Sequence, residues 1–192
     1  MSEPARARAH SDPSATACPA DAVFTVGHST RALAEFIALV SAYGVARIAD
    51  IRTVPRSRRN PQFNAETLGS ALGKAGIDYA PLPALGGLRH PRKDSPNTGW
   101  RNESFRGYAD YMQTDAFAAG LAQLIELSRA APTAIMCAEA VPWRCHRSLV
   151  ADALLVRGVP AIEILSETSW RTHELTSFAH VEGTQITYPA PA

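Results

Sequence analysis

Apolar residues alternate between two patterns from about residue 21 onward. Short continuous apolar runs, such as 23–26 and 133–137, are typical of strands that are buried on both faces. Between these runs, apolar residues recur at helical spacing, as in the segment 33–40. This alternation predicts an α/β fold: a mainly parallel central sheet of about five strands with flanking helices, in Rossmann-like or flavodoxin-like layers.

The pattern and its turn residues give approximate element bounds. We expect strands at 23–26, 45–51, 77–82, 133–137 and 160–165. We expect helices at 33–40, 65–74, 105–112, 117–129 and 145–157. The stretch 85–104 is rich in Gly, Pro, Arg and Asn and is long for a connector, which favours a lid or binding loop. A short hairpin is expected around Glu182-Gly183.

Residues 1–20 have a different composition from the rest of the chain. They are rich in Ala, Ser, Pro and Arg without apolar periodicity, which predicts a disordered N-terminal tail. Residues 21–192 are expected to form a single α/β domain.

Composition and charge narrow the classes of partner. The 192 residues carry a net charge of +1, so no global field draws the chain to nucleic acid or a membrane surface. No apolar run is long enough to span a bilayer, and no membrane partner is expected. Three cysteines suit a reducing compartment, so we expect a cytoplasmic protein. The sequence leaves the oligomeric state and any cofactor open.

Polar and reactive side chains follow four of the expected strands, at the point where each strand ends. They are His28 after the first strand, Asp50 and Arg52 at the end of the second, Gly86 and Gly87 after the third, and Cys137 and Glu139 at the end of the fourth. The carboxyl ends of parallel strands share one edge of a sheet, where ligands bind in such folds, so we expect these residues to lie close together. Each alone could be an ordinary turn or cap, but as a group they favour a functional site.

Cys137 and Cys145 are the reactive pair of this region, and the sequence leaves four roles open for them. Cys145 is expected at a helix start beside His146, where the helix N-terminus and cationic neighbours lower a thiol pKa and give a nucleophilic thiolate. The alternatives are a metal site built from Cys137, Cys145 and His146, a redox pair, and burial of Cys137 as core filler. The cysteine spacing does not match structural zinc modules, so we assign no metal.

Arginines near the same edge indicate an anionic ligand. The run 52–59 contains four arginines and no acid, and it directly follows an expected strand. Guanidinium groups bind phosphates and carboxylates through paired hydrogen bonds. The candidate ligand-binding residues are Arg52, Ser57, Arg58, Gly86, Gly87 and Arg147. The histidines at 10, 90, 173 and 180 lie in polar contexts and receive no role.

These observations lead to a functional hypothesis with two alternatives. The first is an enzyme that acts on an anionic ligand: a nucleotide, a nucleic-acid component or a phosphorylated small molecule. Cys145 or Cys137 would be the thiolate, Glu139 or Asp50 the acid/base, and His28 a second proton carrier. The alternatives are a non-catalytic module that binds nucleic acid or a partner, and a transition-metal protein that uses Cys137, Cys145 and a histidine.

Several strings in the chain together resemble a known family. They are Thr25-Val26-Gly27-His28-Ser29, Asp50-Ile51-Arg52, Leu85-Gly86-Gly87, Met136-Cys137-Ala138-Glu139 and Cys145-His146-Arg147. In this order, the strings resemble the domain of unknown function 488 family, from about Val23 to Tyr188. The resemblance implies a compact bacterial or archaeal α/β domain and assigns it no activity.

Overall fold

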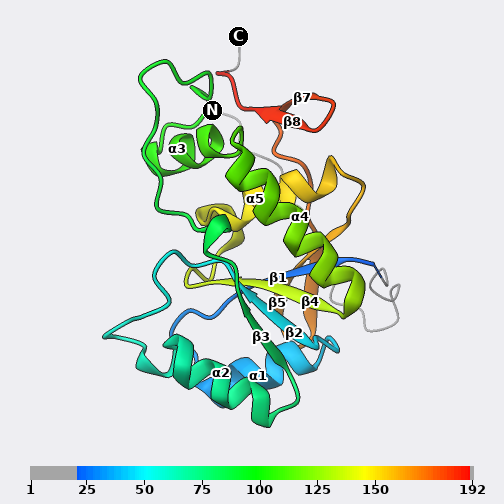
Figure 1. Ribbon diagram of the computed structural model, residues 1–192. Helices are drawn as coiled ribbons and strands as arrows, with labels where there is room; N and C mark the ends of the chain where they lie inside the picture. The colour runs from blue at the N-terminus through cyan, green and yellow to red at the C-terminus, as the bar shows by residue number, and fades with distance from the viewer. Residues whose placement is uncertain (1–20, 191–192) are drawn as a thin grey trace.

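The computed structural model describes residues 21–190 and contains a six-stranded sheet between two layers of helices (Figure 1). The strands of this sheet are β1 (Val23–Gly27), β2 (Arg47–Asp50), β3 (Asp78–Pro81), β4 (Thr133–Cys137), β5 (Ala161–Ser166) and β6 (Ser169–Thr172). Their order is β3-β2-β4-β1-β5-β6, and only β6 is antiparallel to its neighbour within the described residues. The predicted α/β fold with a mainly parallel sheet is therefore confirmed.

The helices divide between the two faces of the sheet. They are α1 (Leu33–Ser41), α2 (Ala65–Lys74), α3 (Glu103–Tyr111), α4 (Asp115–Ala130) and α5 (Arg147–Leu155). Helices α1 and α2 bury Phe36 and Leu72 in one core, while α4 and α5 bury Leu121 and Val150 in the other (Figure 1). Because both faces are covered, β1 and β4 are buried along their whole length, which explains their continuous apolar runs.

Short elements complete the described chain. Three 3-10 turns, each with a proline at its start, are η1 (Pro61–Phe63), η2 (Pro83–Leu85) and η3 (Pro142–Arg144). A hairpin of β7 (His180–Glu182) and β8 (Gln185–Thr187) lies where the sequence predicts one. Gly183 in its turn has a φ of 63°, a conformation that glycine adopts without steric cost.

Two features differ from the sequence prediction. Strand β6 was not expected; it pairs with β5 after a tight turn and widens the sheet by one strand. Helix α5 begins at Arg147 and not at Cys145, because the turn η3 occupies the preceding residues and leaves Cys145 in an extended conformation. Cys145 therefore lies in the connection between η3 and α5.

Two further expectations concern the N-terminal tail and membrane-spanning helices. The tail predicted for residues 1–20 lies outside the described residues. Within residues 21–190, no helix combines the length and the apolar character that crossing a membrane requires.

Candidate functional site

A cavity of about 440 Å³ opens at the carboxyl edge of the sheet, in the size range of small-molecule sites. Its walls come from five segments of the chain. The lining residues are Arg52, Thr53, Val54, Gly87, Leu88, Asn102, Ser104, Phe105, Cys137, Ala138, Glu139, Arg144, Cys145 and His146. The parallel topology is the reason for this convergence, because the ends of β2 and β4 are adjacent in the sheet.

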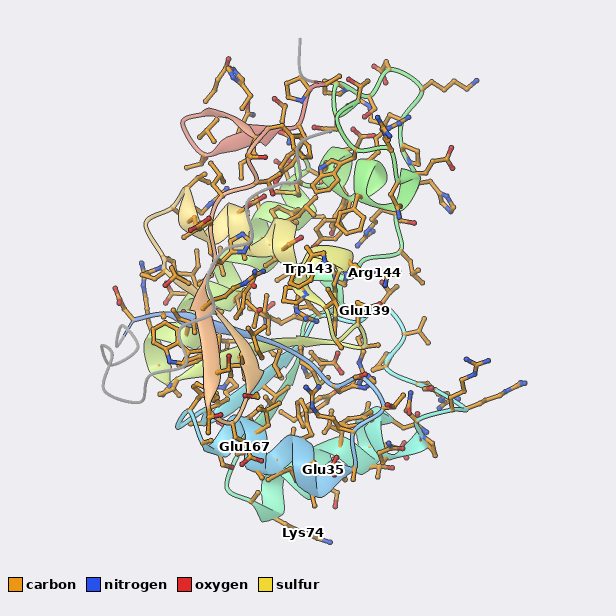
Figure 2. The ribbon with its side chains drawn as sticks, turned by 180° about the vertical axis from the view of Figure 1, so that it is seen from behind. Glu35, Lys74, Glu139, Trp143, Arg144 and Glu167 are labelled. Carbon is orange, nitrogen blue, oxygen red and sulfur yellow. A yellow bond between two sulfur atoms is a disulfide. The ribbon has the colours of Figure 1, made fainter. Side chains whose placement is uncertain are left out.

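The cavity gathers part of the residue set predicted from the sequence. Cys137, Cys145, Glu139, Arg52 and Gly87 line it. The other predicted residues do not line it: His28, Asp50, Ser57, Arg58, Gly86 and Arg147. The Glu139 carboxylate is exposed, and Figure 2 shows it beside Arg144 on the same side of the molecule. One acid and one arginine therefore face the opening together.

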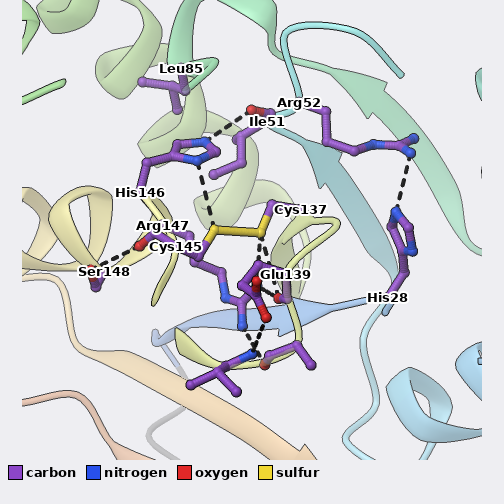
Figure 3. The surroundings of a disulfide bond; sticks show 12 residues. His28, Ile51, Arg52, Leu85, Cys137, Glu139, Cys145, His146, Arg147 and Ser148 are labelled. Carbon is purple, nitrogen blue, oxygen red and sulfur yellow. Dashed lines mark hydrogen bonds between the residues drawn. A yellow bond between two sulfur atoms is a disulfide. The ribbon is translucent and has the colours of Figure 1, made fainter. Parts of the chain in front are cut away.

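The two cysteine sulfurs are in direct contact at this cavity. Cys137 ends β4, Cys145 follows η3, and a disulfide joins them (Figure 3). Both side chains are almost buried, at 3% and 5% exposure, yet both line the cavity. Among the four roles that the sequence leaves open, this contact fits a redox pair best, because a dithiol and a disulfide interconvert only when the sulfurs can meet.

Arg147 lies directly beneath the disulfide, at 1% exposure. One guanidinium nitrogen donates to the Cys137 Sγ at 2.8 Å and to the Glu139 carbonyl oxygen, and the other donates to the Ala140 carbonyl oxygen at 2.8 Å. The Nε atom is buried without a hydrogen-bond partner. Within residues 21–190 no carboxylate forms an ion pair with this guanidinium. Burial lowers the pKa of Arg147 to about 10, so the cation persists at neutral pH.

His146 contacts the other sulfur. Its Nδ1 lies 3.7 Å from the Cys145 Sγ, and its Nε2 lies 3.2 Å from the Ile51 carbonyl oxygen (Figure 3). Burial lowers the pKa of His146 to about 4, so the ring is neutral at neutral pH. A carbonyl oxygen only accepts, so Nε2 carries the proton and Nδ1 presents a lone pair to Cys145.

Gly87 makes room for this ring. A Cβ at Gly87 would lie 2.4 Å from His146 Nδ1, a distance that real Cβ atoms do not reach. The glycine turn thus allows the backbone to pack against the imidazole, and ligand contact is not needed to explain Gly87.

Asp50, Arg52 and His28 form a separate buried cluster beside the cavity. Asp50 accepts hydrogen bonds from the backbone and guanidinium of Arg52 and from the Tyr79 hydroxyl. Burial alone would lower the pKa of Arg52, but the hydrogen bond to Asp50 raises it. Arg52 is therefore a paired cation, and Asp50 uses its lone pairs to hold it.

His28 supports the same arginine. Its Nδ1 donates to the Ser29 carbonyl oxygen at 2.8 Å, its Nε2 faces Arg52 Nη1 at 3.3 Å, and the ring stacks on Phe63. Burial lowers the pKa of His28 to about 4. Both ring nitrogens are thus engaged, and the geometry suits positioning of Arg52 better than the proton transfer that we expected of His28.

Ser57, Arg58 and Gly86 have local roles or none. The Ser57 hydroxyl accepts from the Asn60 backbone N–H, which stabilises the loop after β2. Arg58 is exposed on that loop. A Cβ at Gly86 would meet the Thr53 hydroxyl at 2.4 Å, so this glycine permits a close backbone approach.

Sequence reasoning missed several residues that line the cavity. Thr53, Val54 and Leu88 follow predicted site residues directly. Asn102 comes from the end of the long loop, and Ser104 and Phe105 come from the first turn of α3. The length and composition of that loop were the available signal, but they did not indicate which of its residues turn inward. Arg144 was not among the predicted site residues, yet it lines the cavity.

The described residues hold no group of three or more His, Cys, Asp or Glu side chains suited to a metal ion. The two sulfurs contact each other, and the neighbouring imidazole is held by the Ile51 carbonyl oxygen. Residues 21–190 therefore offer the metal alternative no complete ligand set.

Comparisons with known proteins agree with the resemblance seen in the sequence. Searches of curated proteins and of solved structures gave no match. The model of a protein family described as "Domain of unknown function DUF488" matches residues 32–154, which is more than half of the chain. The matched range includes both cysteines, Arg52 and Arg147, whereas His28 precedes it. The chain therefore belongs to the DUF488 family.

Proposed function

We propose that this protein is an enzyme that acts on an anionic small molecule through thiol chemistry at Cys137 and Cys145. The observation that carries the proposal is the position of Arg147. Its buried guanidinium, without a carboxylate partner in the described chain, touches the sulfur of a cysteine that lines an open cavity. Such a cation stabilises a thiolate, which is the reactive form of cysteine.

Cys137 is the better candidate for this thiolate. Arg147 contacts its sulfur, whereas the Cys145 sulfur faces a neutral imidazole. The sequence favoured Cys145, on the expectation that it begins a helix and has cationic neighbours. Because α5 starts at Arg147, the helix-start argument no longer applies to Cys145, and the cation lies at Cys137 instead. Cys145 becomes the second thiol.

The charge of the ligand follows from the cavity wall. Arg52 is neutralised by Asp50, so the cation with spare hydrogen-bonding capacity is Arg144, which has no ion pair within residues 21–190. A carboxylate or phosphate at Arg144 would lie in the same cavity as the sulfurs. Glu139, also in the wall, is the acid/base candidate and limits the negative charge that the cavity accepts.

The test compares two alkylating reagents of similar size and different charge on the reduced protein. We expect Cys137 to react at neutral pH faster than in the urea-unfolded chain, because the thiolate is stabilised only in the fold. The rate of reaction with iodoacetate, an anion, should increase on folding more than the rate with neutral iodoacetamide. Arg144→Gln should lower this preference for iodoacetate about fivefold. Peptide-resolved mass spectrometry gives the rate at each cysteine.

The control is Arg129→Gln, which removes an exposed arginine on α4 away from the cavity. If neither cavity cysteine reacts faster in the folded protein, and charge makes no difference, the enzyme proposal fails. The alternative of a non-catalytic nucleic-acid or partner-binding module would then gain weight.

A further inference from the structure

The two cysteines have different chemical surroundings, and this asymmetry indicates a reaction. Cys137 has a permanent cation at its sulfur, and Cys145 has the lone pair of a neutral imidazole. In thiol–disulfide exchange one thiol must be ionised to attack, and a second must lose its proton later to resolve the mixed disulfide. At this site Arg147 can stabilise the attacking thiolate, and His146 can accept the proton of the second thiol.

Arg147 also responds to the redox state of the pair. In the dithiol state, a Cys137 thiolate would be a buried anion in contact with the guanidinium. In the disulfide state that anion is absent, and Arg147 donates only to a neutral sulfur and to backbone carbonyl oxygens. A buried cation is far more stable with a counter-ion, so Arg147 favours the reduced state.

From these contacts, and on the basis of the proposed function, we infer that the site exchanges electrons with small anionic disulfides and their thiols. The Cys137 thiolate attacks one sulfur of a disulfide RS–SR, a Cys137–SR bond forms, and RS⁻ leaves. The Cys145 thiol then gives its proton to His146 Nδ1, and its sulfur attacks Cys137.

The second step releases the other RS⁻, which takes the proton from His146. The cysteines lose two electrons in total and the substrate gains them, which yields the Cys137–Cys145 disulfide seen in the structure. The same steps in reverse oxidise two small thiols and regenerate the dithiol, so no further co-reactant enters the balance.

The cavity determines the size and charge of this substrate. At about 440 Å³ it accepts a small molecule, whereas a folded protein would reach the nearly buried sulfurs only through an extended segment. Arg144 at the wall favours a substrate with a carboxylate near the disulfide. Leu88 and Phe105 supply apolar contact for the carbon skeleton beside it.

Trapping of the mixed disulfide tests the inference. The variants carry Cys18→Ser so that only the cavity cysteines remain. Cys145→Ser with oxidised glutathione, an anionic disulfide, should accumulate a mixed disulfide at Cys137, because the resolving thiol is missing. The protein that carries Cys18→Ser alone should form the internal Cys137–Cys145 disulfide. Cys137→Ser should react with oxidised glutathione at least tenfold more slowly than Cys145→Ser.

Charge dependence is measured with cystamine, a cationic disulfide. Oxidised glutathione should react faster than cystamine, and Arg144→Gln should reduce this ratio about fivefold, while Arg129→Gln leaves it unchanged. Equal rates for the two disulfides would overturn the anionic substrate class. Rapid alkylation of Cys137 without any mixed disulfide would overturn the exchange reaction and leave the proposed enzyme intact. The absence of both reactions would overturn both proposals.

The role of Arg147 has its own readout in the redox equilibrium. In a glutathione redox buffer, Arg147→Met should shift the equilibrium tenfold to a hundredfold toward the disulfide, because the thiolate loses its cation. Arg147→Lys keeps the charge and should bring the equilibrium most of the way back to that of the unaltered protein. If Arg147→Met does not fold, the pH profile of Cys137 alkylation in the unaltered protein decides: a thiol pKa at or above the ordinary value of about 8.5 contradicts this role.

Discussion

Two regions of this molecule bury histidines in opposite charge states. At the carboxyl edge of the sheet, burial lowers the pKa values of His28 and His146 to about 4, and both rings are neutral at neutral pH. Beneath the C-terminal segment, His173 lies between Asp152 and Glu163, at 2.9 and 2.8 Å. Burial alone would lower the pKa of His173, but hydrogen bonds to the two carboxylates raise it to about 9.

The difference lies in the hydrogen-bond partners of the buried groups in the two regions. Asp152 accepts hydrogen bonds from His173, from the Thr176 backbone and hydroxyl, and from the Tyr188 hydroxyl, so its oxygens are satisfied. At the sheet edge, Arg147 has a buried Nε without a partner and no carboxylate in contact within the described chain. Buried polar groups that lack partners are costly, so the unpartnered Nε of Arg147 marks this edge as the candidate site.

The largest effect on stability is expected from disrupting the hydrogen-bonded cluster of Asp152, His173 and Glu163. Asp152→Ala removes the acceptor of four hydrogen bonds and leaves a charged imidazole buried with one acid. We expect a loss of about 3–5 kcal/mol in the free energy of unfolding, measured by urea denaturation. Glu126→Gln, which breaks an exposed ion pair, should cost less than about 1 kcal/mol. A small effect of Asp152→Ala would contradict the structural role of this cluster.

The charge state of His173 predicts the response to alkali. A histidine whose pKa is raised on folding stabilises the fold fully below about pH 6.5 and loses that contribution as the pH rises through about 9. The contribution is on the order of 3 kcal/mol. Stability curves of the unaltered protein and of His173→Gln should therefore converge between pH 7 and 10. Parallel curves would show that His173 is neutral.

The sheet edge should respond to acid instead. A histidine with a lowered pKa stabilises the neutral-pH fold and loses that contribution as the pH falls from about 6.5 through about 4. For His146 the contribution is of similar size, on the order of 3 kcal/mol. His146→Gln cannot protonate, so its stability should fall less than that of the unaltered protein over this range. A steeper fall in the variant would assign a charged ring to His146.

The smallest effect is expected at Arg58. This side chain is exposed and does not line the cavity. Arg58→Gln should change the unfolding free energy by less than about 0.5 kcal/mol and leave the iodoacetate preference of Cys137 unchanged. A loss of that preference would mean that the loop after β2 folds over the cavity when ligand binds, and it would restore the sequence-based assignment of Arg58.

The sequence alone determined the fold class and the sheet edge at which the candidate cavity lies. Continuous apolar runs and helical periodicity are local signals, so β4 at Thr133–Cys137 and α2 at Ala65–Lys74 agree with their predicted bounds. That Cys137 ends a strand and that Cys145 precedes the next helix are also local facts, whereas the contact between their sulfurs is seen only in the structure. Parallel topology then brings the residues after β2 to the same edge.

Tertiary structure alone decided which charges and protons these residues carry. His173 received no role from its sequence context, yet its partners lie 21 and 10 residues away, at Asp152 and Glu163. The lone pair of His146 Nδ1 is directed at Cys145 because the Ile51 carbonyl, 95 residues distant, accepts the ring's N–H at Nε2. Arg147 meets the sulfur of Cys137 because α5 begins two residues later than the periodicity indicated. Ionisation depends on burial and on contacts between distant segments, and a one-dimensional pattern does not contain either.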